Sequence, residues 1–103
     1  MDRLIDIRLV AVTLGVDDIG QQTETRTERI LTGTRGSITR SEWLAAAQGD
    51  RKPVFMVGIS SFDYANEKTA IVDGVEYTIY RTYEGKGDTV ELYLEERVGN
   101  GRN

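Results

Sequence analysis

The sequence predicts a mainly β protein, namely a small antiparallel β-barrel of about six strands with one short helix between strands. Three observations indicate this fold. Apolar and polar residues alternate along most of the chain, which is the period of a β-strand. The alternating runs follow one another without a βαβ rhythm. A single segment, residues 38–53, combines a run of alanines with helix start and stop signals.

The chain has 103 residues, which is enough for one hydrophobic core but not for two. Its composition, 39% hydrophobic and 29% charged, is typical of a folded domain rather than a disordered chain. We therefore assign residues 1–98 to a single barrel domain. The glycine-rich end, residues 99–103, is predicted to be a flexible tail.

The first predicted strand spans residues 3–13, where Ile5, Ile7, Leu9 and Ala11 fall on one face and Asp6 and Arg8 on the other. Val10 and Val12 make the even face apolar towards the end of the run. That change predicts a strand covered on both sides there. Residues 14–22 contain two glycines and two adjacent aspartates, and they predict a loop.

Residues 23–39 are rich in threonine and nearly free of large apolar side chains. Threonine is β-branched and favours strands. Its alternation with charged residues predicts a half-exposed or edge strand, which the charges would protect from stray pairing. Gly33 and Gly36 are interpreted as bulges at which a small barrel bends.

The helical segment begins with a capping box, in which Thr39 accepts from the Glu42 amide and Glu42 reaches back. Ser41 is an alternative N-cap. Gly49 is predicted to end the helix in a left-handed conformation. A helix of roughly two turns is too short to be stable alone, so we expect Trp43 to dock it on the barrel.

The remaining strands follow from alternation and turn residues. Residues 54–61 predict an apolar strand, and residues 61–68 predict a loop that holds two aromatic side chains. Asp73 and Gly74 separate two β runs, which is the pattern of a type I′ hairpin. Residues 84–88 then turn the chain into the last strand.

The composition excludes several kinds of active site. The chain has no cysteine and no histidine, so thiolate metal sites, disulfides and Ser–His or Cys–His nucleophiles are ruled out. The pairs Asp17/Asp18 and Asp63/Glu67 lack the alternating carboxylates of a calcium loop and are interpreted as solvated. The strand glutamates around Glu91 are interpreted as a solvated face. The sequence predicts no enzyme, no metal and no cofactor.

Net charge and hydropathy limit the partners. The net charge is −4, with 13 basic against 17 acidic residues, which disfavours sequence-independent binding to nucleic acid. Charges interrupt the apolar residues at the N-terminus, and no segment has the length of a membrane span, so we expect intracellular synthesis and no membrane partner. Tyr80 and Tyr93 lie opposite in phase to the apolar residues of their strands and are candidates for a protein interface.

The order of these elements resembles a known family. The matching features are an amino-terminal strand, a loop, a polar strand and four later segments. The later segments are Gly36-Ser-Ile-Thr-Arg-Ser-Glu-Trp-Leu-Ala-Ala-Ala47, Phe62-Asp-Tyr64 and the strand patterns at 75–83 and 90–97. In this order the chain is similar to the head–tail joining proteins of tailed bacteriophages and prophages. These proteins are also called head-completion proteins, head-closure proteins or stoppers, and head–tail adaptors.

The resemblance implies a structural subunit of the virion, made in the host cytoplasm. It implies a ring of copies of this chain between portal or adaptor proteins above and tail-completion or tail-tube proteins below. Such a ring extends or closes the DNA channel, with packaged double-stranded DNA only as channel content, and docks the tail. The segment that constricts the channel or grips the ring above would correspond to residues 38–52, and the aspartate loop is a second candidate.

The candidate interface or channel residues lie in residues 38–52, in the aspartate loop, or at strand positions whose phase predicts exposure. Trp43 is expected to act mainly as an internal anchor. They are Asp17, Asp18, Arg40, Glu42, Trp43, Asp50, Arg51, Lys52, Tyr80 and Tyr93. Two alternatives stay open. One is a tail-side completion or terminator protein, which the fold alone does not separate from a head-completion protein. The other is an oligonucleotide-binding barrel, which requires a basic groove with exposed aromatic side chains.

Overall fold

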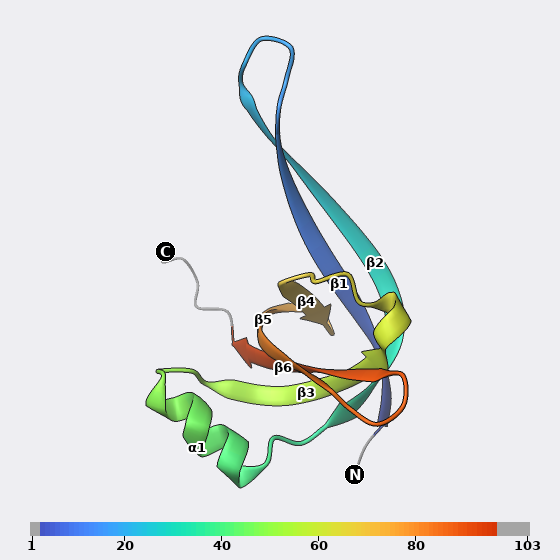
Figure 1. Ribbon diagram of the computed structural model, residues 1–103, viewed down its shortest axis with the longest axis vertical. Coiled ribbons are helices and arrows are strands. Elements are labelled where there is room, and N and C mark those ends of the chain that lie inside the picture. The colour runs from blue at the N-terminus through green and yellow to red at the C-terminus, as the bar shows by residue number, and fades with distance from the viewer. Residues whose placement is uncertain (1–2, 97–103) are drawn as a thin grey trace.

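The computed structural model describes residues 3–96, so the tail predicted at 99–103 lies outside the described residues. Six strands form a closed antiparallel barrel in the order β1-β2-β3-β6-β5-β4 (Figure 1). The predicted fold class is thereby confirmed. The elements are β1 Arg3–Val16, β2 Gln22–Gly36, α1 Arg40–Gln48, β3 Pro53–Ser60, the short 3₁₀ helix η1 Ser61–Asp63, β4 Thr69–Val72, β5 Val75–Glu84 and β6 Thr89–Glu96.

One hydrophobic core fills the barrel. The inward side chains alternate along the strands, as the period of two requires. Aromatic rings close one part of it, because Phe55 and Tyr77 meet edge to face with centroids 5.1 Å apart. The buried members of the core are Ile7, Leu9, Phe55, Val57, Ile59, Ala70, Val72, Ile79, Val90, Leu92 and Leu94.

Strands β1 and β2 extend well beyond the barrel. They pair with each other from Arg3↔Arg35 to Val16↔Gln22. The barrel neighbours reach only part of this ladder, since β4 pairs with residues 8–10 of β1 and β3 with residues 34–36 of β2. Residues 11–27 therefore form a two-stranded projection, called the arm below (Figure 1).

The arm corrects the predicted loop at 14–22, because the strands continue to Val16 and resume at Gln22. The two strands stabilise each other through ladder hydrogen bonds that a single-strand pattern does not reveal. Only the tip turns. There the Asp17 carboxylate accepts from the amides of Ile19 at 3.0 Å and Gln21 at 2.9 Å, and Gly20 takes a φ of 85°. The prediction of a half-exposed strand at 23–39 agrees with the exposed first half of β2.

Two glycines of β2 were predicted to form bulges, and this was wrong. Gly33 and Gly36 both lie in regular register, opposite Ile5 and Met56. Gly33 instead allows close packing, because a Cβ there would lie 2.6 Å from Val57 Cγ1. The register shifts occur in β3, between Pro53 and Phe55, and in β5, between Ile79 and Arg81.

Helix α1 begins at the predicted N-cap, with Thr39 Oγ1 accepting from the Glu42 amide at 3.2 Å. The other half of the predicted capping box was wrong, because the Glu42 carboxylate accepts from Tyr80 and Arg81 instead of reaching back to the cap. Its end differs. The left-handed residue is Asp50, with a φ of 62°, and not Gly49. The predicted docking by Trp43 was also wrong, because this side chain is 49% exposed and Ala46 is the buried residue of the helix. The helix is held on the barrel through Glu42, which Tyr80 and Arg81 contact, and not through its tryptophan.

The hairpin between β4 and β5 confirms the turn prediction. Asp73 and Gly74 have positive φ of 52° and 79°, as a type I′ turn requires at both central residues. They are flanked by the paired Val72 and Val75. No helix within residues 3–96 is long and apolar enough to cross a membrane.

Candidate assembly surfaces

A polar network holds α1 against the outer face of β5 and β6. The Tyr80 hydroxyl donates to Glu42 Oε2 at 2.8 Å, and Arg81 Nε donates to both Glu42 oxygens at 3.0 and 3.1 Å. Arg81 also forms an ion pair with Glu42 through its terminal nitrogen. We call this network the clasp, and its members are Glu42, Arg51, Tyr80, Arg81, Tyr93 and Glu95.

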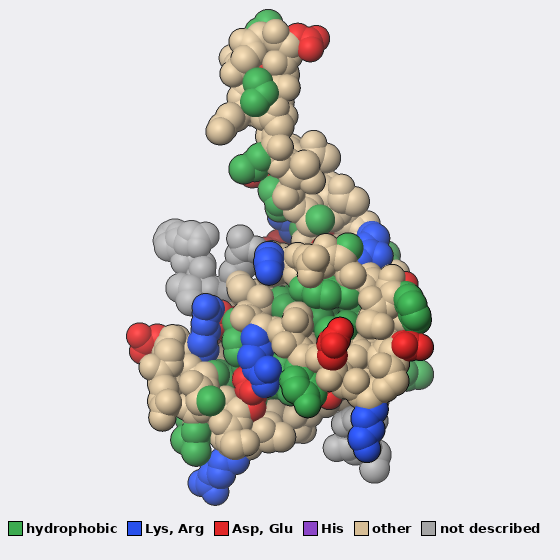
Figure 2. Space-filling model, viewed as in Figure 1, with side chains coloured by type: hydrophobic (Ala, Val, Ile, Leu, Met, Phe, Trp, Pro, Cys, Tyr) green, Lys and Arg blue, Asp and Glu red, His purple; other side chains and the backbone are tan. Residues whose placement is uncertain are grey.

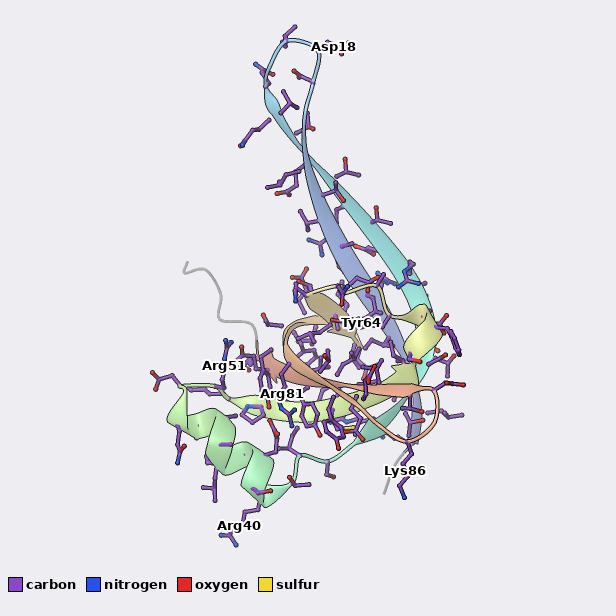
Figure 3. All side chains as sticks on the ribbon, in the orientation of Figure 1. Asp18, Arg40, Arg51, Tyr64, Arg81 and Lys86 are labelled. Atoms are coloured by element: carbon purple, nitrogen blue, oxygen red, sulfur yellow. The ribbon has the colours of Figure 1, made fainter. Side chains whose placement is uncertain are left out.

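Aromatic stacking completes the clasp. The Arg81 guanidinium lies 4.3 Å from the centre of the Tyr93 ring, and the Arg51 guanidinium lies 5.8 Å from that of Tyr80. The two tyrosine rings meet edge to face at 6.3 Å. Arg51 also forms an ion pair with Glu95 on β6. Figure 3 labels Arg81 and Arg51 near α1.

The bulge in β5 makes this geometry possible. Ile79 pairs with Leu94 and Arg81 with Tyr93, so Tyr80 has no partner across β6. An extra residue of this kind redirects the side chains beside it. Tyr80 and Arg81 are adjacent in sequence, yet both reach Glu42.

Hydrogen bonds fix the charge states in the clasp. The bond from Arg81 lowers the pKa of Glu42, partial burial opposes that change, and the bond from Tyr80 adds to the lowering. Burial, together with the bond to Glu42, raises the pKa of Tyr80. Burial and a bond to Glu91 raise the pKa of Tyr93 to about 12. At neutral pH the clasp therefore contains a charged Glu42 and two neutral tyrosines.

The structure thus brings together four of the predicted interface residues, but within one chain. Glu42, Arg51, Tyr80 and Tyr93 contact one another or their clasp partners. Their polar groups are occupied in fixing the helix. Sequence analysis missed Arg81, and the signal it lacked was the bulge, since a regular strand would point Tyr80 and Arg81 to opposite faces.

The other predicted residues lie around the helix and at the arm tip. Arg40, Asp50 and Lys52 are exposed, and within residues 3–96 none of them forms an ion pair. Figure 3 shows Arg40 pointing away from the barrel and Asp18 at the tip of the arm. Asp17 is engaged in the tip turn, whereas the exposed Asp18 carboxylate has no hydrogen-bond partner in the described chain.

The arm carries the largest set of exposed apolar side chains that sequence analysis missed. The side chains at Val12, Leu14, Val16 and Ile19 are 51%, 68%, 70% and 78% exposed. The first three share one face because they alternate along β1. Figure 2 shows hydrophobic side chains along the arm and an acidic group at its tip. The signal was present, since the apolar even positions starting at Val10 continue to position 16.

The prediction that β1 is covered on both sides near its end is correct at Val10, which is 2% exposed, and wrong at Val12. The arm base is fixed by charge pairs on its outer side. Arg26 donates to Glu76 of β5 at 2.8 Å, and Glu28 accepts from both Arg8 and Arg26 at 3.4 Å. Of these exposed contacts, the Arg26–Glu76 pair joins the arm base to β5.

A buried ion pair supports the same base from the other side. Glu67 was interpreted as solvated, and this was wrong, because it is 4% exposed. It accepts from Arg29 of β2 at 2.6 and 3.1 Å and from the Ala65 amide at 2.9 Å. Burial alone raises the pKa of Glu67, but these hydrogen bonds lower it below its usual value. A buried carboxylate needs such partners.

A surface groove lies between the end of β2, α1 and the start of β3. It has a volume of about 510 Å³ and is lined by Arg3, Arg35, Gly36, Ser37, Ile38, Trp43, Pro53, Val54 and Phe55. The Arg35 guanidinium lies 4.0 Å from the centre of the Phe55 ring. Trp43 therefore lines a groove with arginines and no carboxylate.

Glu91 and Glu95 of β6 were interpreted as part of a solvated face, and this was wrong, because both carboxylates have partners. Glu91 accepts from the Tyr93 hydroxyl at 2.9 Å, and Glu95 pairs with Arg51. Within residues 3–96 no cluster of three or more acidic side chains is arranged to hold a metal ion. The surfaces that stand out are therefore the arm and the groove.

No protein-family model, curated protein or solved structure matches this chain.

Proposed function

We propose that this chain is a structural head-completion protein of a tailed bacteriophage or prophage. It forms a ring between the portal or adaptor and the tail, extends or closes the DNA channel, and docks the tail. The observation that carries the proposal is the arm, because it projects beyond the closed barrel and exposes a row of apolar side chains to solvent.

The arm suits a ring subunit for an energetic reason. Four apolar side chains that are at least half exposed gain free energy only when another surface covers them. At about 25 cal/mol per Å² of apolar area, burying them contributes several kcal/mol to association. The β1–β2 ladder keeps the arm extended out to Val16 and Gln22, so less entropy is lost on docking.

The helix supports the proposal as a fixed contact. The clasp holds α1 on the barrel while Trp43, which lines the groove, remains 49% exposed. The helix and the arm lie at opposite ends of the molecule (Figure 1). A subunit with rigid contact surfaces at both ends suits the space between a portal ring and a tail. The net charge of −4 suits a channel wall that DNA passes without adhering.

Co-sedimentation tests this function. Phage particles assembled without the head-completion ring are incubated with the full chain, and isolated tails are incubated in parallel. We expect the protein to sediment with the particles and to make them competent to accept tails. A Leu14→Ser/Val16→Ser variant should not bind, whereas Val75→Ser, at a valine of the β5 start that is 47% exposed, should bind normally. Binding to isolated tails alone would assign the chain to the tail side.

A further inference from the structure

We propose that the arm tip of one copy docks in the groove of the next copy, with Ile19 and Val16 against Trp43 and Val54 and with Asp18 facing Arg35. This inference rests on the proposed ring and names its internal contact. It joins the exposed apolar tip of the arm to the groove that combines exposed apolar side chains with arginines and no carboxylate.

The arm tip presents both kinds of recognition group. Ile19 is 78% and Val16 70% exposed, so the tip is an apolar knob. Asp17 is used by the turn, where it accepts from two backbone amides. Asp18, which Figure 3 shows at the arm tip, has no hydrogen-bond or ion-pair partner within residues 3–96, so its carboxylate is left for an incoming cation. A complementary surface for this tip would be an apolar groove that also contains a positively charged side chain.

The groove supplies that complement. Val54 is 44% and Trp43 49% exposed, so each has apolar surface left to cover. Arg3 and Arg35 line the groove, and neither forms an ion pair within residues 3–96. Arg35 lies over the Phe55 ring, which fixes the guanidinium in place before a carboxylate arrives. A pre-positioned arginine and an exposed indole are typical anchors of protein interfaces.

The larger groove, of about 610 Å³ on the outer face of β1 and β4, fits the tip less well. It is lined by Arg3 and Arg8, but Asp6 and Asp73 lie in the same lining. Arg8 already pairs with Glu28. An incoming Asp18 would meet like charge there, which is unfavourable.

The positions of tip and groove determine the symmetry. The tip lies at one end of the long axis, and the segment that joins β2 to α1 lies at the other (Figure 1). A contact between two different surfaces is heterologous, so each copy retains a free arm and a free groove after pairing. Repeating the contact closes a ring when each step also rotates the subunit. An arm-to-arm contact would stop at a dimer.

Single-stranded nucleic acid is the competing occupant, because the groove combines arginines with an exposed tryptophan. The observations favour the arm. Two guanidiniums neutralise few phosphates, and one of them already lies on Phe55. The remaining lining residues contribute apolar surface and small polar groups, and the chain as a whole is acidic.

Disulfide trapping tests the contact, because the chain has no cysteine of its own. Full-length Ile19→Cys and Val54→Cys proteins are mixed under mild oxidation. We expect a 1:1 cross-linked heterodimer in about tenfold greater yield than from Ile19→Cys mixed with Val75→Cys, because docking raises the local thiol concentration. Val75 is a matched control at 47% exposure. Equal yields in the two mixtures would overturn the proposal.

The charge pairing has its own test in the same assay. Adding Asp18→Lys to the arm partner should reduce the cross-link yield about tenfold, and Arg35→Glu in the groove partner should restore it. A yield unaffected by the charge at position 18 would overturn the pairing.

Trp43 is the single tryptophan, so its fluorescence reports on the groove. Quenching by oligothymidylate together with loss of the cross-link would assign the groove to nucleic acid instead.

The inference and the proposed function fail in different ways. Rings on phage particles that contain no Ile19–Val54 cross-link would overturn the arm contact and leave the function standing. A cross-link in solution from a protein that never adds to particles would support the arm contact and overturn the head-completion role.

Discussion

The Tyr80 hydroxyl donates a 2.8 Å hydrogen bond to Glu42 Oε2, which joins helix α1 to strand β5 across 38 residues of sequence. This bond and the Arg81 ion pair replace the apolar anchor that a short helix usually needs. The tryptophan of the helix is thereby free to face the groove. The clasp thus connects the stability of the barrel to the presentation of a contact surface.

Removing the Tyr80 hydroxyl should weaken the clasp. We expect Tyr80→Phe to lower the free energy of unfolding by about 1 kcal/mol, because Glu42 loses one hydrogen bond while the ring remains. Urea unfolding measures this change. A double-mutant cycle with Glu42→Gln should show a coupling of about 0.5–1 kcal/mol. Tyr83→Phe is the control, since Tyr83 is 57% exposed and its hydroxyl has no partner in the described chain. Zero coupling would show that the bond does not hold the helix.

Acid should remove the contribution of Glu67. Its pKa is lowered in the folded protein, so its stabilisation is complete above the usual value of 4.5 and is lost as pH falls through the lowered pKa. At pH 7 we expect Glu67→Gln to cost about 1–3 kcal/mol in unfolding free energy. The difference from wild type should shrink steadily below pH 4.5. A difference constant down to low pH would contradict the assigned ion pair.

A methyl group at position 33 should disrupt the barrel. In Gly33→Ala the new Cβ would lie 2.6 Å from Val57 Cγ1 and 3.0 Å from the Gly58 carbonyl oxygen. We expect a loss of about 1–3 kcal/mol from overpacking, measured by thermal or urea unfolding. Gly58→Ala is the matched control, because its nearest neighbour would be at an ordinary 3.5 Å. Equal stability of the two variants would mean that β2 and β3 are less closely packed.

Trp43 should matter more for assembly than for folding. A buried tryptophan would cost about 3–5 kcal/mol on truncation to alanine. At 49% exposure we expect Trp43→Ala to cost about 1 kcal/mol in unfolding free energy. Leu44→Ala, at 53% exposure and outside the groove, should cost a similar amount. Only Trp43→Ala should reduce sedimentation with phage particles. A loss of about 3–5 kcal/mol in Trp43→Ala would contradict this prediction and would mean that Trp43 is an internal anchor.

Local chemistry made several elements predictable from sequence. The Asp73-Gly74 turn follows from the positive φ that those two residues tolerate. The start of α1 follows from the hydrogen bond between Thr39 and the amide three residues later. Alternation also identified the core strands, since each inward position repeats every second residue. Each of these features depends on neighbours in the chain.

The features that sequence analysis missed depend on partners far along the chain. The length of β1 depends on its pairing with β2. Sequence patterns missed this length because the glycines and adjacent aspartates at 14–22 are typical of a loop. Tyr80 and Arg81 reach one carboxylate because of a bulge that leaves no mark on the alternation. Glu67 is buried because Arg29 lies opposite, 38 positions away. Among the candidate interface residues, sequence patterns identified exposed positions such as Asp18 but did not separate them from clasp members such as Glu42.

The most direct test of the head-completion assignment is electron microscopy of portal–adaptor particles incubated with the full chain. The account predicts an additional ring of barrels beneath the adaptor, with each arm reaching the neighbouring subunit. Particles that remain unchanged while the same protein decorates isolated tails would contradict it.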